Sequence, residues 1–391
     1  MASVETTDVV VIGAGIAGAS AAFHLGELGV ASILVERDHP ASGPTGKSSA
    51  VSHLFYTEPC LSQLARRGCA LLKAVPEITP HPHKVFHEVG MLWACGAENE
   101  AVWRDSATRI RDREGGGIEM IDPAAMAAMA PGFVMDDIVL ALWEEAYGYG
   151  DPYDATNAFA AAARGKGVAM KQRTSATELV IEGGCIRGVV LSDGSRIAAD
   201  RVICAMGPWT GGFIEAQTGV RLPLHIERHA MAVLDAPGRA RAVLPFAWCD
   251  DILAHYARPE RDGTILIGTW AGGGTGVRNE GAERPEEHAD PDNYFAGSDD
   301  AEAAFIVEQM LPRVPAIGEL GIRPGYACLY DMSPDDLPII DHVPGVEGLV
   351  VVAGSSGHGF KMGPAVGEEA VRLATTGASE LAAPLGLARF G

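Results

Sequence analysis

Three glycines near the N-terminus have the spacing of a turn that binds a dinucleotide. Gly13, Gly15 and Gly18 follow directly on a run of four apolar residues, 9–12. In such a turn the first glycine permits the sharp bend, the second lets the backbone approach a pyrophosphate, and the third lets the following helix pack closely on the strand. Glu36 stands 21 residues after Gly15, which is the spacing expected of an acid that binds ribose hydroxyls. The pattern predicts a dinucleotide without a 2′-phosphate, either NAD or FAD.

A second glycine-rich segment, at the other end of the chain, favours FAD. Residues 348–354 read as a buried strand, 355–361 as a glycine-rich loop, and Pro364 as the first turn of a helix that ends near Gly377. A single dinucleotide that touches both ends of the chain must hold its reactive ring far from its adenine, as FAD does. Backbone N–H groups of the loop would also stabilise the negative charge that a flavin gains at N1 and at the C2 carbonyl on reduction.

Strand and helix signals place both motifs in α/β units. The apolar run at 9–12, a small-residue helix at 19–28 and a second apolar run at 31–35 form a strand–helix–strand unit. An alanine-rich helix at 154–165 is followed by strand signals that extend to residue 207. Two domains are predicted: a Rossmann-like domain of residues 1–80, 146–212 and 326–391, and a discontinuous second domain of residues 81–145 and 213–325.

Composition argues against several classes of function. The chain has 51 acidic and 30 basic residues, a net charge of −21, so it repels nucleic acids and anionic membrane surfaces. No apolar run approaches the ~20 residues of a membrane-spanning helix, and the N-terminus lacks the pattern of a secretory signal. The seven cysteines include no Cys-x-x-Cys pair, which favours a reducing, cytoplasmic location. His225 and His229 lie four apart, but in a strand-like context, so we predict no metal site.

Four segments together make the whole chain resemble the D-amino-acid-oxidase-like superfamily of FAD-dependent enzymes. They are residues 11–18, 205–209, 328–341 and 356–361. Within the superfamily the chain looks most like the monomeric sarcosine oxidase group, which includes oxidases of N-methyl amino acids and of pipecolate. The resemblance implies an α/β fold with a Rossmann-like FAD-binding domain built from separated segments. It also implies an α+β substrate domain with an antiparallel sheet over the flavin.

The resemblance assigns roles to four residues. In the sarcosine oxidase group, a cysteine at the place of Cys328 holds the flavin through a thioether to its 8α-methyl carbon; the alternative is a small buried residue beside the cofactor. Lys361, one of six lysines, matches the group that binds the substrate carboxylate. The alternative is an exposed lysine near a helix start, where it would oppose the helix dipole. Tyr330 and Tyr256 match pocket tyrosines, with core packing as the alternative.

Three positions depart from the pattern of the group. Leu266 stands where the group has a lysine over the flavin that helps oxygen accept electrons, and Trp270 replaces a pocket histidine. The carboxylate-binding arginine of the group has no match in the early loop, where His53 or Lys47 lies nearest. Sarcosine itself is therefore not the expected substrate, and the electron acceptor is either oxygen or another compound. The other residues expected at the cofactor are Arg37, Lys47, Ser48, Gly207, Gly357, His358, Gly359, Phe360 and again Lys361.

The sequence as a whole predicts an FAD-dependent amine oxidoreductase. It would oxidise the C–N bond of a small secondary or primary amino acid to an imine by hydride transfer to flavin N5. The rate would rise with pH through a group that deprotonates the bound amine. Two alternatives stay open: a dehydrogenase of a 2-hydroxy acid or of a larger biosynthetic amine, and a flavin-binding subunit without turnover. The expected partners are the substrate and the electron acceptor, with the chain a monomer or a small homo-oligomer.

Overall fold

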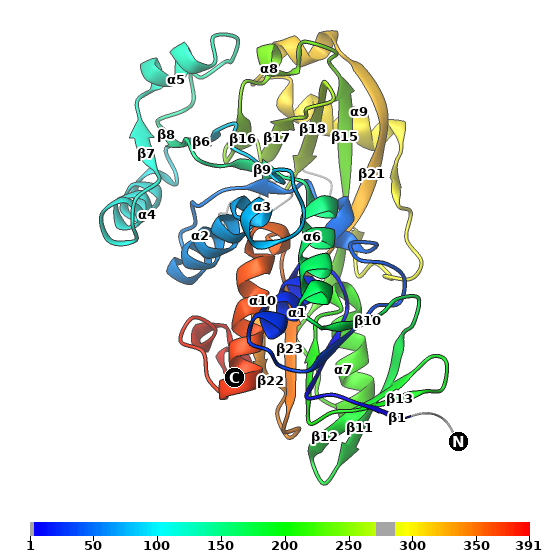
Figure 1. The fold of residues 1–391 in the computed structure, drawn as a ribbon. Helices are drawn as coiled ribbons and strands as arrows, with labels where there is room; N and C mark the ends of the chain where they lie inside the picture. Colours follow the sequence, from blue (N-terminus) through cyan, green and yellow to red (C-terminus); the bar gives the residue numbers. More distant parts are fainter. Residues whose placement is uncertain (1–3, 271–285) are drawn as a thin grey trace.

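Two large sheets organise the chain in a computed structural model that describes residues 4–270 and 286–391. Part of the predicted segment 213–325 therefore lies outside the described residues. The six-stranded sheet and its helices occupy the lower half of Figure 1, and a larger sheet occupies the upper half. This is the mixed α/β architecture that the sequence predicts.

The six-stranded sheet brings together the two ends of the chain. Its strands, in spatial order, are β10 (Ala169–Lys171), β3 (Ser32–Val35), β2 (Val9–Ile12), β14 (Arg201–Cys204), β23 (Leu349–Ala353) and β22 (Ile339–His342). The first five are parallel and β22 is antiparallel to β23. Because β14 pairs with β2 on one side and with β23 on the other, the N-terminal and C-terminal motifs end at the same edge of the sheet.

Two helices from opposite ends of the chain pack against each other on this sheet (Figure 1). They are α1 (Ile16–Glu27) and α10 (Gly359–Thr376). Their backbones approach so closely that a Cβ on Gly367 would lie 2.4 Å from the carbonyl oxygen of Ala17. The Ser20 hydroxyl of α1 donates to the carbonyl oxygen of Pro364, at 2.7 Å.

Pro364 corrects the predicted start of the C-terminal helix. It lies inside α10 rather than in its first turn, because the helix already begins at Gly359. The glycines at 357 and 359 resemble a loop in sequence, yet the backbone of His358 already has right-handed helical angles. Lys361 is consequently the third residue of a helix and not part of a loop.

The larger sheet has ten strands among the described residues and is mostly antiparallel. The strands on its path are β20 (Gly297–Ser298), β21 (Gly321–Met332), β15 (His225–Asp235), β18 (Thr264–Thr269), β17 (His255–Pro259), β16 (Ala247–Asp250), β6 (Met91–Cys95), β8 (Leu140–Glu144) and β7 (Glu119–Ile121), and β19 (Glu286–Glu287) pairs with β15. β21 runs through the predicted domain boundary between 325 and 326 and pairs with β15 on both sides of it. The domain limits stay a prediction.

The remaining elements cover or connect the sheets. A four-stranded sheet contains β1 (Val4–Thr6), β13 (Arg196–Ala198), β12 (Cys185–Leu191) and β11 (Ala176–Glu182), and a three-stranded sheet contains β4 (Val51–Ser52), β9 (Gly148–Gly150) and β5 (Phe86–His87). The other helices are α2 (Pro59–Lys73), α3 (Val75–Ile78), α4 (Glu100–Arg113), α5 (Pro123–Met129), α6 (Pro152–Gly165), α7 (Thr210–Thr218), α8 (Ala240–Val243) and α9 (Asp300–Met310). Short 3₁₀ turns lie at Pro44–Lys47, Gly207–Trp209, Pro315–Glu319, Ala383–Leu385 and Leu387–Phe390.

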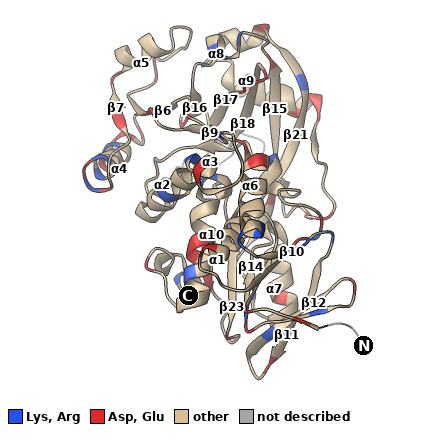
Figure 2. Ribbon diagram, in the orientation of Figure 1, with Lys and Arg blue, Asp and Glu red and all other residues tan. Residues whose placement is uncertain are grey.

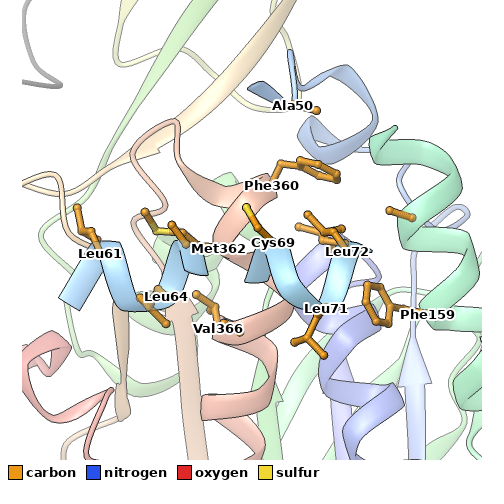
Figure 3. Close-up of a cluster of buried hydrophobic side chains, with 14 of the residues drawn as sticks. Ala50, Leu61, Leu64, Cys69, Leu71, Leu72, Phe159, Phe360, Met362 and Val366 are labelled. Atoms are coloured by element: carbon orange, nitrogen blue, oxygen red, sulfur yellow. The ribbon is translucent and has the colours of Figure 1, made fainter. Parts of the chain in front are cut away.

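A continuous apolar core holds the first turns of α10 in place. Leu64 and Leu72 of α2, Met362 and Val366 of α10 and Phe159 of α6 all belong to one buried cluster, in which Leu64 lies by Met362 and Val366 and Leu72 lies on the side of Phe159 (Figure 3). Burial of each such side chain contributes about 1.5–3 kcal/mol. Charged residues gather on peripheral elements such as α4 (Figure 2). A charged group inside this core therefore needs a specific reason.

Candidate active site

A cavity of about 340 Å³ lies at the carboxyl edge of the parallel strands. This edge is where α/β sheets bind their ligands. The cavity extends from Glu36 and Arg37 at one end to Cys328 and Tyr330 at the other. We call it the first cavity. The predicted residues that line it are Gly13, Gly15, Glu36, Arg37, Ser48, Gly207, Cys328, Tyr330, Gly357, His358, Gly359 and Phe360.

The three N-terminal glycines meet three different spatial requirements. A Cβ on Gly13 would lie 2.4 Å from the carbonyl oxygen of Ala205, and Gly13 has a φ of 96°. A Cβ on Gly18 would lie 1.9 Å from the carbonyl oxygen of Gly13, so only glycine lets α1 pack on the turn. A Cβ on Gly15 would lie 3.1 Å from the Thr45 hydroxyl, and Gly15 lines the cavity where α1 begins. The open helix end beside a bare backbone fits a pyrophosphate.

The end of the first cavity at Glu36 contains a fixed carboxylate. Glu36 is 8% exposed, and its two oxygens accept from the backbone N–H groups of Ala14, at 2.7 Å, and Asp38, at 2.9 Å. A carboxylate held in this way keeps lone pairs free for ribose hydroxyls. Arg37 lies 3.9 Å from the ring centroid of Trp209, and Asp292 accepts from both side chains. The donors and acceptors here fit FAD.

The opposite end of the first cavity contains the predicted attachment cysteine. Burial raises the pKa of the Cys328 thiol to about 12, and the nearby charge of Lys47 opposes that shift. The sulfur lies 3.5 Å from the carbonyl oxygen of Pro44. Lys47 itself does not line the cavity; it donates to the hydroxyl of Tyr294, at 2.6 Å. Its predicted role in cofactor binding stays a prediction.

The loop before α10 is fixed to the end of β21. The buried carboxylate of Asp331 accepts from the backbone N–H of Gly354, at 2.8 Å, and from the hydroxyl of Ser355. A Cβ on Gly357, which has a φ of 78°, would lie 2.8 Å from the ring of Tyr330. The N-terminus of α10 and the N-terminus of α1 both line the first cavity. Both helix ends favour negative charge in the cavity.

A second cavity, of about 140 Å³, adjoins the first. The two share Ser48, Tyr330, Gly357, His358 and Phe360, so they meet at the start of α10. The other polar and aromatic residues around the second cavity are Ser49, His53, Phe55, Tyr56, Thr57, Trp93, Glu227, His229, Cys249, Tyr256, Trp270, Ser356 and Lys361. It therefore contains all four predicted catalytic residues: Lys361, Tyr330, Tyr256 and His53.

Lys361 has the properties of a binding group for an anion. It is 5% exposed, and its ammonium lies 5.8 Å from the ring centroid of Tyr56. Within residues 4–270 and 286–391 this ammonium group has no hydrogen-bond or ion-pair partner. Burial lowers its pKa to about 8, and the nearby Cys69, Cys249 and Glu144 act in the opposite direction. Because a buried, unpaired ammonium is costly, an anionic ligand here would gain strongly from the contact.

Two neutral histidines lie beside this lysine and share one tyrosine. The Tyr56 hydroxyl is 3.1 Å from Nδ1 of His358 and 3.4 Å from Nε2 of His53. Burial, together with the charge of Lys361, lowers the pKa of His358 to about 3 and that of His53 well below its usual range. The positive charge in this part of the cavity therefore resides on Lys361. The sequence reading missed Tyr56, whose only local signal is its spacing of three from His53.

Aromatic rings form the opposite wall of the second cavity. The hydroxyls of Tyr256 and Tyr330 lie 3.3 Å apart, and the rings of Tyr256 and Trp270 stack with centroids 5.8 Å apart. The ring of His229 stacks on Tyr330, with centroids 4.0 Å apart. Leu266 is buried in β18 and is not among the described residues that line either cavity.

A buried carboxylate that the sequence did not reveal holds the segment that contains His53 and Tyr56. Glu144, at the end of β8, is fully buried and accepts from the backbone N–H groups of Leu54, at 2.6 Å, and Phe55, at 2.8 Å. It thereby fixes the two residues that lie between His53 and Tyr56. Burial raises the pKa of Glu144 to about 8, against these two hydrogen bonds.

Replacing Glu144 with glutamine should change how stability depends on pH. The folded protein holds a proton at Glu144 that the unfolded chain releases between its ordinary pKa of 4.5 and about 8. Glu144 should therefore lower the unfolding free energy across this window, by several kcal/mol at about 1.4 kcal/mol for each pKa unit, relative to a variant without this carboxyl group. Lys361 makes the unfolding free energy depend on pH only above about pH 8, where its ammonium loses the proton in the folded protein. His53 and His358, whose pKa values are lowered, act in the opposite direction below pH 6.5 in all three proteins, so the difference between the curves is the test. In denaturant titrations between pH 5 and 8, the unfolding free energies of the wild type and of the exposed control Glu145→Gln should fall relative to that of Glu144→Gln; parallel curves for all three would contradict the prediction.

The structure also bears on the predictions about a metal site, the cysteines and membrane-spanning helices. His225 and His229 both bond to the carboxylate of Glu227, and the described residues contain no group of three suitable metal ligands. All seven cysteines are unpaired, and the cytoplasmic location stays a prediction. Across residues 4–270 and 286–391, no helix combines the length and apolar character needed to cross a bilayer.

Comparisons with known proteins agree with this geometry. The family model "DAO: FAD dependent oxidoreductase" matches residues 8–373. The chain is 26% identical to monomeric sarcosine oxidase of Bacillus sp. (strain NS-129), over 95% of this chain and 94% of that protein. It is 27% identical to N-methyl-L-tryptophan oxidase of Salmonella arizonae, over 94% of each. The crystal structure of L-proline dehydrogenase from P. horikoshii shares the fold, with a TM-score of 0.86, 24% identity and coverage of 99% and 98%. The chain belongs to the DAO family of FAD-dependent oxidoreductases, as the resemblance in its sequence predicted.

Proposed function

We propose that this protein oxidises the C–N bond of a small secondary or primary amino acid to an imine, with the substrate carboxylate bound by Lys361. The observation that carries the proposal is the buried ammonium of Lys361. It has no hydrogen-bond or ion-pair partner among the described residues, and it lines a cavity that adjoins the first cavity. Several proteins similar to the chain are named as oxidases, dehydrogenases or deaminases of amino acids, which supports the same substrate class.

The residues of the second cavity would each act on a different part of such a substrate. Lys361 would fix the carboxylate, so that the carbon next to nitrogen faces the first cavity. Tyr256, Trp270 and Tyr330 would enclose the apolar part and exclude water. FAD, when bound, supplies acceptance of a hydride at N5 from the substrate carbon. The N-terminus of α10 would stabilise the negative charge that accompanies this transfer.

An amine panel under anaerobic conditions tests the proposal. We expect the visible flavin band to bleach with at least one amino acid, but not with the corresponding amine that lacks a carboxylate. Bleaching by a 2-hydroxy acid or by a larger amine would replace the proposed substrate class, and no bleaching by any compound would support a flavin-binding subunit. Admission of air then identifies the acceptor, because rapid return of the colour requires reaction with oxygen.

Covalent attachment of the flavin through Cys328 is the second part of the proposal. The position of this thiol at the far end of the first cavity from Glu36 supports it. We expect acid-precipitated wild-type protein to retain its flavin, whereas Cys328→Ala should release it into the supernatant. Cys249→Ala is the matched control, because Cys249 lines only the second cavity. Release of all flavin from the wild type would refute the covalent bond and leave the oxidase proposal intact.

A further inference from the structure

Paired strands β15 and β21 present one row of functional side chains to the cavities. Glu227 lies opposite Tyr330, and His229 lies opposite Cys328. Directly opposed residues in a sheet share a face, and residues two apart along a strand share it too. The face that presents the predicted attachment cysteine and the pocket tyrosine therefore also presents a carboxylate and an imidazole. Glu227 and His229 both line the second cavity.

The Glu227 carboxylate holds two imidazoles, one on each side. Its oxygens lie 2.8 Å from Nε2 of His225 and 2.9 Å from Nε2 of His229. Burial acts to raise the pKa of Glu227, but the bonds from His229 and His225 hold it below its usual value. An ionised carboxylate only accepts hydrogen bonds, so Nε2 of each neutral imidazole must carry the proton.

This arrangement leaves the other nitrogen of His229 as a proton acceptor. Among the described residues, Nδ1 of His229 has no hydrogen-bond partner, and the side chain is 10% exposed. Its ring is fixed by stacking on Tyr330. A neutral imidazole oriented by an ionised carboxylate is the arrangement by which proteins build a general base.

We propose that His229 is the base that takes the proton from the substrate ammonium before C–N oxidation, and that Glu227 positions it. The inference rests on the proposed function. The substrate ammonium loses one proton to Nδ1 of His229 and becomes the neutral amine. The resulting imidazolium is stabilised by the Glu227 carboxylate and later returns its proton to solvent. This step is a proton transfer, in which no group is oxidised or reduced.

The other titratable groups around the cavity are poorer acceptors of this proton. His53 and His358 have pKa values depressed by burial and by Lys361, and both contact the Tyr56 hydroxyl. Burial raises the pKa values of Tyr256 and Tyr330. The other titratable or charged groups near His229 whose side chains the structure describes are Cys328 on β21, His225 and Arg228 on β15, and His288, whose ring lies 5.9 Å from that of His225. Arg228 forms an ion pair with Glu302.

Flavin reduction by the best amino acid, followed anaerobically in the holoenzyme, tests the proposal. In the wild type the rate should rise with pH through the ionisation of the base. His229→Gln should reduce the rate at neutral pH by about 10²- to 10³-fold. It should also move the rise to the pH at which the free amine loses its own proton. His83→Gln is the control: His83 is exposed and lines neither cavity, so its profile should match the wild type.

Chemical rescue separates a base from a structural residue. Added imidazole should restore flavin reduction in His229→Ala, and Glu227→Gln should show an intermediate loss with the same shift of the pH profile. A substrate analogue that keeps the carboxylate but has sulfur in place of the amine nitrogen should perturb the flavin spectrum on binding. Its affinity should be the same in the wild type and in His229→Gln. An unchanged pH profile in His229→Gln, or absence of rescue, would overturn the role of His229 alone. A wild type that no amino acid reduces would overturn the proposed function as well.

Discussion

Lys361→Met should reduce kcat/KM for an amino acid substrate by about 10²- to 10³-fold, because removal of one partner of a buried charge pair costs about 2–5 kcal/mol. Most of the loss should appear in KM, since the ammonium binds the carboxylate before and during the reaction. A substrate analogue without a carboxylate should lose far less. The same variant should unfold at a higher denaturant concentration at pH 7. The lowered pKa of Lys361 means that its charge opposes folding below about pH 8, and this cost disappears with methionine.

Steady-state kinetics with paired substrates, together with denaturant titration, measure both effects. Lys84→Met is the control, because Lys84 is exposed and distant in sequence from the candidate site. An equal loss for the carboxylate substrate and its uncharged analogue would remove Lys361 from carboxylate binding. A simultaneous gain of stability and loss of activity is specific to a binding group that the fold keeps at a cost.

Gly18→Ala should yield a protein that binds no flavin. The added Cβ would lie 1.9 Å from the carbonyl oxygen of Gly13 and 3.0 Å from its carbonyl carbon, and both are backbone atoms. Relief of this overlap requires that α1 move away from the turn, which widens the pyrophosphate site and destabilises the fold by about 1–3 kcal/mol. Because α1 also packs closely on α10, the displacement would reach the second glycine-rich segment.

The ratio of flavin to protein absorbance after purification measures this loss. Gly212→Ala is the control: a Cβ there has no atom within 4 Å, and the residue lies in helix α7, so the substitution should leave the flavin content unchanged. A yellow Gly18→Ala protein with a normal flavin ratio would show that the turn does not hold the cofactor.

Local patterns made part of the site predictable. The turn at Gly13–Gly18 and the acid at Glu36 act through neighbours in sequence, so their spacing alone indicates a pyrophosphate and a ribose. The meeting of the chain ends was predicted from two glycine-rich segments that would bind the same ligand. Glu144 could not be found in this way, because its partners are backbone groups 90 and 89 residues away.

The Glu227–His229 pair shows where sequence reading stops. Its i, i+2 spacing in a strand predicts a shared face, but the spacing does not say which strand lies alongside. Only the register of β15 against β21 places His229 opposite Cys328. The start of α10 at Gly359 depends likewise on tertiary packing, since glycines at 357 and 359 disfavour a helix locally.

The order of strands in the six-stranded sheet also determines when the protein can acquire its cofactor. β2 ends at Ile12 and β14 ends at Cys204, but the neighbour of β14 on its other side, β23, begins only at Leu349. A ribosome that adds about 5–20 residues per second has therefore made nearly the whole chain before the wall of the first cavity that α10 provides exists. Until then the nascent polypeptide exposes an unpaired edge of β14 and an incomplete pyrophosphate cradle. The first cavity is consequently incomplete until the segment that forms α10 has been synthesised and has folded onto the sheet.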